Sequence, residues 1–291
     1  MPSLKEVKNR ITSVQSTRKI TSAMKMVASS KLHRAQQTIE NLCPYEKSIN
    51  SIMSQLVANV EDYSSAYTHR RDIKKIAIIA VSSNSSLCGG FNLNVIKQVI
   101  KLIDAHKKDG YQITVIPIGK KIGEAVKKME FGFENDYAEM LDHLSYEKAS
   151  SFAEKVINDY CLEEFDKVEI VYNHFKNTSS QILTTETFLP IVSSQKDKER
   201  DQRDGAKCID YIIEPSPKEV LEELIPISLK LKIYTILCDS LASEHSARVI
   251  AMQVATDNAD ALLQELTLTY NKTRQQAITN ELLDIVGGSL K

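Results

Sequence analysis

The sequence contains few cysteines, and they are not grouped. There are five among 291 residues, at positions 43, 88, 161, 208 and 238, and no two form a CxxC pair. An odd number of scattered cysteines argues against a disulfide framework and a zinc site, and is typical of a reducing compartment. The six histidines also lack metal-ligand spacing such as HExxH. We therefore expect no metal and no cofactor.

Long apolar runs are absent as well. No segment approaches the roughly 18 uncharged apolar residues that would indicate a transmembrane helix. The N-terminus has no apolar signal-peptide core. Its amphipathic, acid-poor start is similar to a mitochondrial presequence, but it leads directly into a long predicted helix, and we interpret it as mature structure.

Glycine and proline are missing from residues 227–286. As a single α-helix, this run would be about 90 Å long, whereas helices of globular proteins usually have about 8–20 residues. The helix begins earlier, because Ser216-Pro217-Lys218-Glu219 is a capping box with proline at the first helical position. A helix of this length is expected to reach a partner.

A second long helix is predicted at the N-terminus, where Ser3 and Glu6 form another capping box. Apolar residues then recur with the three-four spacing of a coiled-coil seam. They are Leu4, Val7, Ile11, Val14, Ala28, Leu32, Ala35, Ile39 and Leu42. Arg18, Thr21 and Lys25 interrupt the seam, so we expect its middle to face something other than a plain leucine-type partner. The pattern continues past Pro44 to about Val57.

The middle of the chain alternates between strand-like and helix-like patterns. This alternation is typical of a Rossmann-like, mainly parallel sheet with helices on its faces. Strands are expected at 75–82, 113–118, 168–172, 182–192 and 208–213, and helices around 91–103, 120–130 and 146–164.

The predicted fold class is therefore α/β plus coiled coil. Two long antiparallel helices, at residues 1–60 and 216–288, enclose an inserted Rossmann-like α/β domain at 70–213. At 1.5 Å per residue, the C-terminal helix extends about 20 Å beyond its partner. The projecting tip carries Ile278, Leu282, Leu283, Ile285 and Val286, an apolar stripe wider than a surface helix needs. We expect it to be buried in another protein, with Arg274, Gln275 and Thr279 available to hydrogen-bond that partner.

The N-terminal helix is basic although the net charge of the whole chain is −1. Residues 3–40 contain eight Lys or Arg and two acidic residues. A basic helix of this kind binds nucleic acid, a membrane surface or an acidic protein groove.

The best candidate for catalysis is the loop Ser82–Asn92, which follows the first expected strand. Nucleotides bind at such strand-to-helix turns in α/β folds, but the loop has neither GxGxxG nor GxxxxGK[ST]. Cys88 lacks a histidine with an orienting partner, which a cysteine nucleophile needs. We interpret the loop as a tight turn and expect no catalytic residue.

Four segments resemble the gamma subunit of the bacterial F-type ATP synthase, and the resemblance covers nearly the whole chain. They are ITSVQSTRKITSAMKMVASSKLHRAQ (11–36), LCGGFN (87–92), ASEHSARVIAMQVATDNA (242–259) and LTLTYNKTRQQAITNELLDIVGG (266–288). The resemblance implies the rotor shaft of a proton-translocating enzyme. It would lie inside a hexameric head of alpha and beta subunits, with its α/β domain on the membrane c-ring beside the epsilon subunit. The chain would be peripheral, on the cytoplasmic face of the bacterial inner membrane.

The resemblance also implies roles for individual residues. Contacts with a beta-subunit catch loop and with the head's hydrophobic bearing are implied for Arg274, Gln275, Thr279, Glu244, Arg248, Ile278, Leu282 and Val286. Met24 and Lys25 match positions that face the beta-subunit lever, and Tyr211 and Glu214 match positions on the c-ring. The chain departs from the family at Asn84-Ser85-Ser86, where Asp-Arg-Gly is usual, which puts any charged contact there in doubt.

Two other functions remain open from the residues alone. A coiled-coil adaptor that binds nucleic acid would use the basic helix, although that helix lacks interleaved aromatic residues. A Rossmann-type enzyme would bind nucleotide at the Ser82–Asn92 loop, against the missing phosphate motifs. The first predicts salt-dependent binding to DNA or RNA, and the second predicts saturable nucleotide binding by the isolated chain.

Overall fold

The computed structural model describes residues 3–59, 67, 71–129, 137–191 and 213–289. The chain forms two compact units. The helical unit combines residues 1–30 with residues 248–291, and the sheet unit comprises residues 31–247. Each unit is described separately below.

Two long helices contribute to both units. Helix α1 runs Leu4–Asn59 and contains Pro44, and helix α7 runs Pro217–Ser289 and contains Pro226. The Ser3 hydroxyl accepts a hydrogen bond from the Glu6 amide at 3.2 Å. The Ser216 hydroxyl accepts from the Glu219 amide at 3.3 Å and lies 3.0 Å from the Glu219 carboxylate. Both predicted helix starts are thus confirmed.

The sheet unit contains four strands in the order β2-β1-β3-β4. They are β1 (Lys75–Val81), β2 (Gln112–Ile118), β3 (Lys167–Asn177) and β4 (Ser180–Leu189). The pairs β1–β2 and β1–β3 are parallel, whereas β3 and β4 form an antiparallel hairpin. The expected mainly parallel sheet is confirmed, and its central strand β1 is buried from Ile76 to Val81 because both of its faces are covered.

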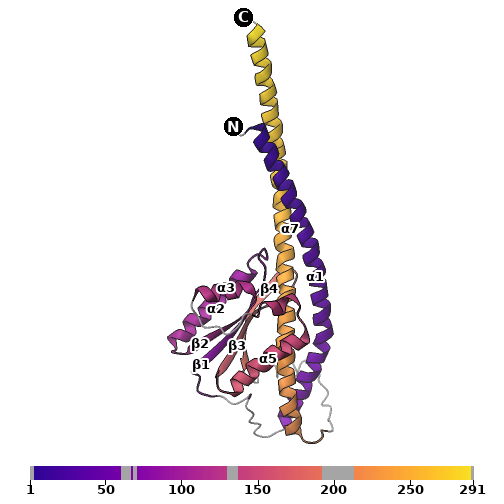
Figure 1. Cartoon of the computed structure of the whole chain (residues 1–291). Helices are drawn as coiled ribbons and strands as arrows, with labels where there is room; N and C mark the ends of the chain where they lie inside the picture. Colours follow the sequence, from indigo (N-terminus) through magenta and orange to yellow (C-terminus); the bar gives the residue numbers. More distant parts are fainter. Residues whose placement is uncertain (1–2, 60–66, 68–70, 130–136, 192–212, 290–291) are drawn as a thin grey trace. The chain divides into compact units, whose positions relative to one another are not determined.

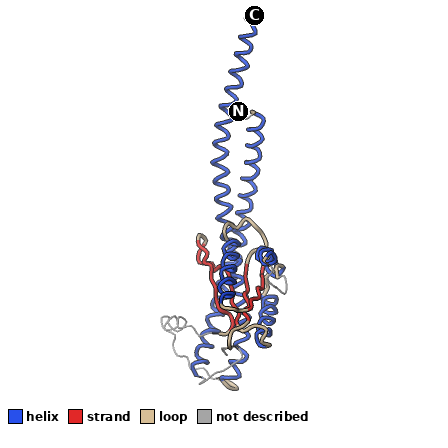
Figure 2. The backbone as a smooth tube through the Cα atoms, turned by 90° about the vertical axis from the view of Figure 1, so that its left-hand side faces the viewer, coloured by secondary structure: helices blue, strands red, loops and turns tan. Residues whose placement is uncertain are grey.

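Helices cover the two faces with separate apolar clusters. Helices α2 (Phe91–Lys108) and α3 (Lys120–Lys128) pack on one face through residues such as Val95, Val99 and Ile122. Helix α5 (Tyr146–Cys161), the short α4 (Glu139–Asp142) and the 225–237 stretch of α7 cover the other face. Figure 1 labels these elements, and Figure 2 shows the strands in red between the helices.

Several predicted boundaries differ from the structure. Strand β3 continues five residues beyond the expected end at Tyr172, because it pairs with β4 across the short turn at Thr178 and Ser179. Helix α5 ends at Cys161 rather than 164, since Glu163 adopts a left-handed φ of 63°. The strand expected at 208–213 lies outside the described residues except for Ile213, which is not in a strand. Among the described helices, none is long and apolar enough to cross a membrane.

Gly119, at the end of β2, has a conformation that other residues rarely adopt. Its φ is 109°, and an added Cβ would lie 2.5 Å from the backbone oxygen of Ser82. We predict that Gly119→Ala lowers the free energy of unfolding of the full chain by about 2–4 kcal/mol, because strained backbone and a clash combine. Urea denaturation measures this change.

Gly123→Ala is the matched control. Gly123 lies in α3, and a Cβ there would have no heavy atom within 4 Å. Alanine should leave stability unchanged or raise it by up to about 1 kcal/mol, because glycine is the poorer helix former. Equal effects at both positions would contradict the assignment of strain to Gly119.

Candidate functional site

The two helices of the helical unit are antiparallel. The hydroxyl oxygens of Thr21 and Thr256 are 2.9 Å apart, and the guanidinium of Arg18 forms an ion pair with Asp260. Two of the three polar interruptions of the predicted seam therefore meet polar residues of the chain's own C-terminal helix. Arg18 and Asp260 also line a shallow groove with Leu263, Gln264, Thr267 and Leu268.

The end of α7 extends beyond the start of α1. If the register of these two contacts continues, Leu4 lies opposite about residue 274, and Figure 1 shows the yellow end of α7 continuing past that point. The large apolar side chains described beyond it are all exposed. Their exposed fractions are Ile278 49%, Leu282 57%, Leu283 63%, Ile285 67% and Val286 55%.

The polar residues expected to contact a partner differ in accessibility. Arg274, Gln275 and Thr279 are exposed, and the Thr279 hydroxyl donates to the Gln275 carbonyl at 2.9 Å. Arg248 is half-buried, whereas Glu244 is buried with 7% exposure. The tip residues are therefore better placed than Glu244 to meet another chain directly.

Exposed apolar residues also line the shaft of the helical unit, and the sequence analysis did not single them out. Met24 and Lys25 are half-buried, while their neighbours Met26 and Val27 are 67% and 59% exposed. Further exposed apolar side chains are Ile20, Val254, Leu262 and Leu268. The sequence signal that could have identified them is an apolar residue at a helix position outside the coiled-coil seam. Apolar surface of this kind marks an interaction site.

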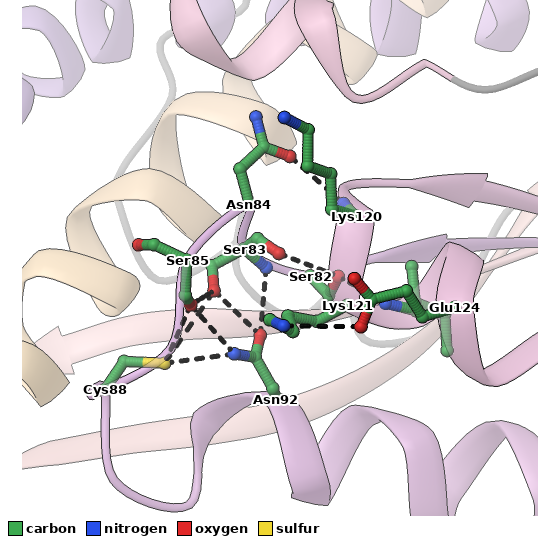
Figure 3. A network of polar contacts seen from close by, with 10 residues as sticks. Ser82, Ser83, Asn84, Ser85, Cys88, Asn92, Lys120, Lys121 and Glu124 are labelled. Carbon is green, nitrogen blue, oxygen red and sulfur yellow. Dashed lines mark hydrogen bonds and ion pairs between the residues drawn. The ribbon is translucent and has the colours of Figure 1, made fainter.

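The Ser82–Asn92 loop uses its polar groups internally, as Figure 3 shows. The Ser83 amide donates to Asn92 Oδ1 at 2.9 Å, and the Ser83 hydroxyl donates to the Ser85 carbonyl at 2.5 Å. At the adjacent start of α3, the Ile122 amide donates to the Ser82 hydroxyl at 3.0 Å. Cys88 is 1% exposed, and its sulfur accepts from Asn92 Nδ2 at 3.1 Å. The amides of Ser83 and Ile122 are thus engaged by side chains of the chain itself.

Asn84 connects three segments of the sheet unit. Its Oδ1 accepts from the Lys120 amide at 3.0 Å, at the start of α3. Its Nδ2 donates at 2.8 Å to both the Ala138 carbonyl and the Asp142 carboxylate. An amide fits this position because it both donates and accepts, whereas an ionised aspartate only accepts.

The expected c-ring contacts are only partly described. Glu214 is exposed, just before the start of α7, and Tyr211 lies outside the described residues. Nothing in the sheet unit tests either contact, so both stay predictions.

A charged cluster lies where the β3–β4 hairpin meets α7 in the sheet unit, and sequence reasoning missed it. Asp239 accepts from His174 Nδ1 at 2.6 Å and from the Phe175 amide at 2.8 Å. Glu186 accepts from the Tyr172 hydroxyl at 2.8 Å and pairs with Lys232 at 3.2 Å. Because its members are far apart in sequence, no local pattern signals the cluster.

Burial perturbs the acids of this cluster. It raises the pKa of Asp239, although the hydrogen bonds from His174 and Phe175 oppose the shift. Burial also raises the pKa of Glu46 on α1; Lys232 opposes this, and the Glu186 and Asp239 carboxylates reinforce it. Among the described residues, no group of three or more His, Cys, Asp or Glu side chains is arranged to hold a metal ion.

Comparison with known proteins agrees with this arrangement. The sequence model of the ATP synthase family matches residues 3–290. The chain is 51% identical to the ATP synthase gamma chain of Phocaeicola vulgatus over 291 residues, which is all of both chains. It is 44% identical to that of Flavobacterium johnsoniae, covering 99% of this chain and 98% of the relative. The chain belongs to the ATP synthase gamma chain family.

The fold of the gamma-chain family is also found in solved structures. The rotor of the Euglena gracilis mitochondrial ATP synthase matches with a TM-score of 0.65 at 20% identity, over 94% of this chain and 98% of that one. The central stalk and c-ring structure from Tetrahymena thermophila matches with a TM-score of 0.59 at 21% identity, over 81% and 99%. At 20% and 21% identity, these two matches show a shared fold.

The raised pKa of Glu46 generates a prediction about pH. The folded chain binds the Glu46 proton more tightly than the unfolded chain does, so Glu46 favours folding as pH falls through its raised pKa and opposes folding above it. We predict that Glu46→Gln raises the Tm at pH 8, and that this gain disappears toward pH 4. Thermal unfolding across this range measures it.

Glu40→Gln provides the control, since Glu40 is exposed on the same helix. It should shift Tm little at any pH. A gain for Glu46→Gln that is the same at pH 8 and pH 4 would contradict the role of the buried charge.

The Asn84 contacts generate a second prediction. Asn84→Asp keeps the acceptor for the Lys120 amide but places a carboxylate against Asp142 and the Ala138 carbonyl. We predict a loss of about 1–3 kcal/mol in the free energy of unfolding at pH 7. Adding Asp142→Asn should recover most of this loss, because the amide then supplies the missing donor. Failure of the double variant to recover would show that the Asn84–Asp142 contact is not responsible.

Proposed function

We propose that this chain is the shaft that couples rotation of the c-ring to conformational changes at the beta-subunit catalytic sites. In a proton-translocating F-type enzyme, it would serve both synthesis and hydrolysis of ATP. The exposed apolar end of α7 carries this proposal most strongly. A helix end that exposes five large apolar side chains is poorly suited to water and well suited to a bearing in another protein.

The helical unit would occupy the hexameric head of alpha and beta subunits. Ile278, Leu282 and Val286 would enter the hydrophobic bearing. Arg274, Gln275 and Thr279 would hydrogen-bond the beta-subunit catch loop, with Glu244 and Arg248 near the same contact. Met24 and Lys25 would face the beta-subunit lever, and we add the more exposed Met26 and Val27 to that surface.

The α/β domain would form the foot of the rotor. Tyr211 and Glu214 would rest on the c-ring, with the epsilon subunit alongside. The functional division would follow the sequence boundaries, with helices at 1–60 and 216–288 as the shaft and residues 70–213 as the foot. Attachment to the membrane would then be indirect, through the c-ring, on the cytoplasmic face of the bacterial inner membrane.

The chain would act mechanically and would supply no catalytic residue. An asymmetric shaft presents a different surface to each beta site in turn, and a surface shifts a conformational equilibrium only by binding two states unequally. Moving a site almost completely between two states takes about 5.5 kcal/mol of differential contact. At about 25 cal/mol per Å², roughly 220 Å² of apolar surface supplies that energy. The exposed side chains of the shaft are the natural source of it.

The tip provides the test of this function. We predict that Leu282→Asp combined with Ile285→Asp weakens assembly with the source organism's alpha and beta subunits at least about ten-fold, because two charges would enter an apolar bearing. Both side chains are exposed, so the fold of the isolated chain should not change. Co-purification and ATPase activity measure assembly, and circular dichroism measures the fold.

Two further chains complete the experiment. Asp284→Asn changes an exposed charged residue between Leu282 and Ile285 and should assemble normally. A chain that ends at Lys272 should lose both stable assembly and activity. If the double variant assembles as well as the parent, the tip is not buried in the head. If the parent chain itself never assembles but binds nucleotide or nucleic acid alone, the rotor function is wrong.

A further inference from the structure

Besides the Lys232–Glu186 ion pair, the β3–β4 hairpin is hydrogen-bonded to α7 at two points, which we call the hairpin joint. At the first, Asp239 accepts hydrogen bonds from His174 Nδ1 and the Phe175 amide, at 2.6 and 2.8 Å. At the second, the Ser246 hydroxyl donates to the Thr178 carbonyl at 2.7 Å and lies 3.0 Å from Gln181 Nε2. All these residues belong to the sheet unit, where Figure 1 shows β4 beside α7.

The two points lie on one face of α7. Asp239 and Ser246 are seven residues apart, which is about two helical turns or 10 Å along the axis. The residues between them include Ala242 and Ser243, both fully buried, so small side chains let the hairpin approach the helix closely. Ser246 is also fully buried and Asp239 is 9% exposed. Their hairpin partners His174 and Thr178 are exposed, so water reaches the outer side of these hydrogen bonds.

The contacts below the joint are of a different kind. Between Ile225 and Leu237, the helix packs on the sheet mainly through apolar side chains. Apolar burial is strong but non-directional. It therefore resists separation of the helix from the sheet better than it resists sliding of one surface over the other. Hydrogen bonds weaken steeply when their angle is disturbed, and bonds to an ionised carboxylate are the stronger ones. Two such anchors on one helix face oppose both rotation of the helix about its axis and tilting.

We propose that the hairpin joint is where torque passes between the α/β domain and α7. This inference rests on the rotor function, which requires the domain and the helix to turn together. The polypeptide connections alone are weak torsional links, because the domain is inserted between the two helices. Torque therefore also needs contacts between the domain and α7, which are the apolar packing at Ile225–Leu237 and the hairpin joint. Asp239 and Ser246 are thus positioning residues that make the connection stiff.

Angular fluctuation measures the proposed stiffness directly. A reporter rod is attached to Lys108→Cys, an exposed position on α2, after Cys43, Cys161 and Cys208 are changed to alanine. The complex with alpha and beta subunits is immobilised through its head and observed during a catalytic pause. The variance of the rod angle is inversely proportional to the stiffness between the head and the α/β domain.

We expect Ser246→Ala and Asp239→Ala each to raise this variance about two-fold, since one of two directional anchors is lost. Asp239→Asn should raise it less, because its amide oxygen still accepts from the Phe175 amide. ATP hydrolysis should continue in each variant. If the parent complex does not hydrolyse ATP, the rotor function is wrong. If a variant hydrolyses ATP but its variance rises, the result supports the role of the joint.

Lys230→Gln is the matched control. Lys230 also links α7 to the α/β domain, through a 3.2 Å ion pair with Glu154 on α5, but Glu154 is 58% exposed. Exposed pairs contribute little, so this variant should keep the parent variance. If Ser246→Ala keeps the parent variance, or if Lys230→Gln raises it equally, the joint has no special role and the proposal is overturned. If Asp239→Ala does not assemble, the variances of Ser246→Ala and Asp239→Asn still test the proposal.

Discussion

The helical unit is constrained by the difference in length between its two helices, because the end of α7 extends past the start of α1. A helix stabilises itself in water mainly by burying an apolar face against another element. Up to about residue 274, α7 can use α1 for this purpose, and the contact between Thr21 and Thr256 shows that even polar positions are matched across the pair. Beyond it, the described residues of the helical unit supply no second helix. In the rotor function proposed above, the head of the enzyme would bury the apolar side chains of this end.

The polar contacts of the paired region also have a purpose beyond stability. A seam of leucines alone would be stronger, yet it would tolerate shifts of register. An ion pair between Arg18 and Asp260, half exposed on both sides, contributes little energy. It does define which turn of α1 lies beside which turn of α7. A shaft that presents a different surface at each angle needs this definition more than it needs additional stability.

Sequence reasoning succeeded where the physical signal is local or periodic. The two capping boxes, the coiled-coil seam and the β-branched strands are each local or periodic patterns, so both long helices and the mainly parallel sheet followed from them. It failed where residues meet across the fold. His174 and Asp239 are 65 positions apart and neither belongs to a motif, so their contact depends on a register that only the folded sheet defines. The exposure of Met26 and Val27 was missed because an apolar residue predicts burial, and the sequence does not show whether its own chain or another protein buries it.

The Ser82–Asn92 loop shows how a fold that often binds nucleotides serves another use. Strand β1 has β2 on one side and β3 on the other, so the strand order reverses at β1. In α/β proteins, ligands bind at such a point, beyond the carboxyl ends of the strands. Binding there requires free amides, but Asn92 and the Ser82 hydroxyl occupy the amides of Ser83 and Ile122. The same hydrogen bonds tie the loop to the starts of α2 and α3. These hydrogen bonds connect the loop to two helices, and such a connection would suit the foot of the proposed rotor.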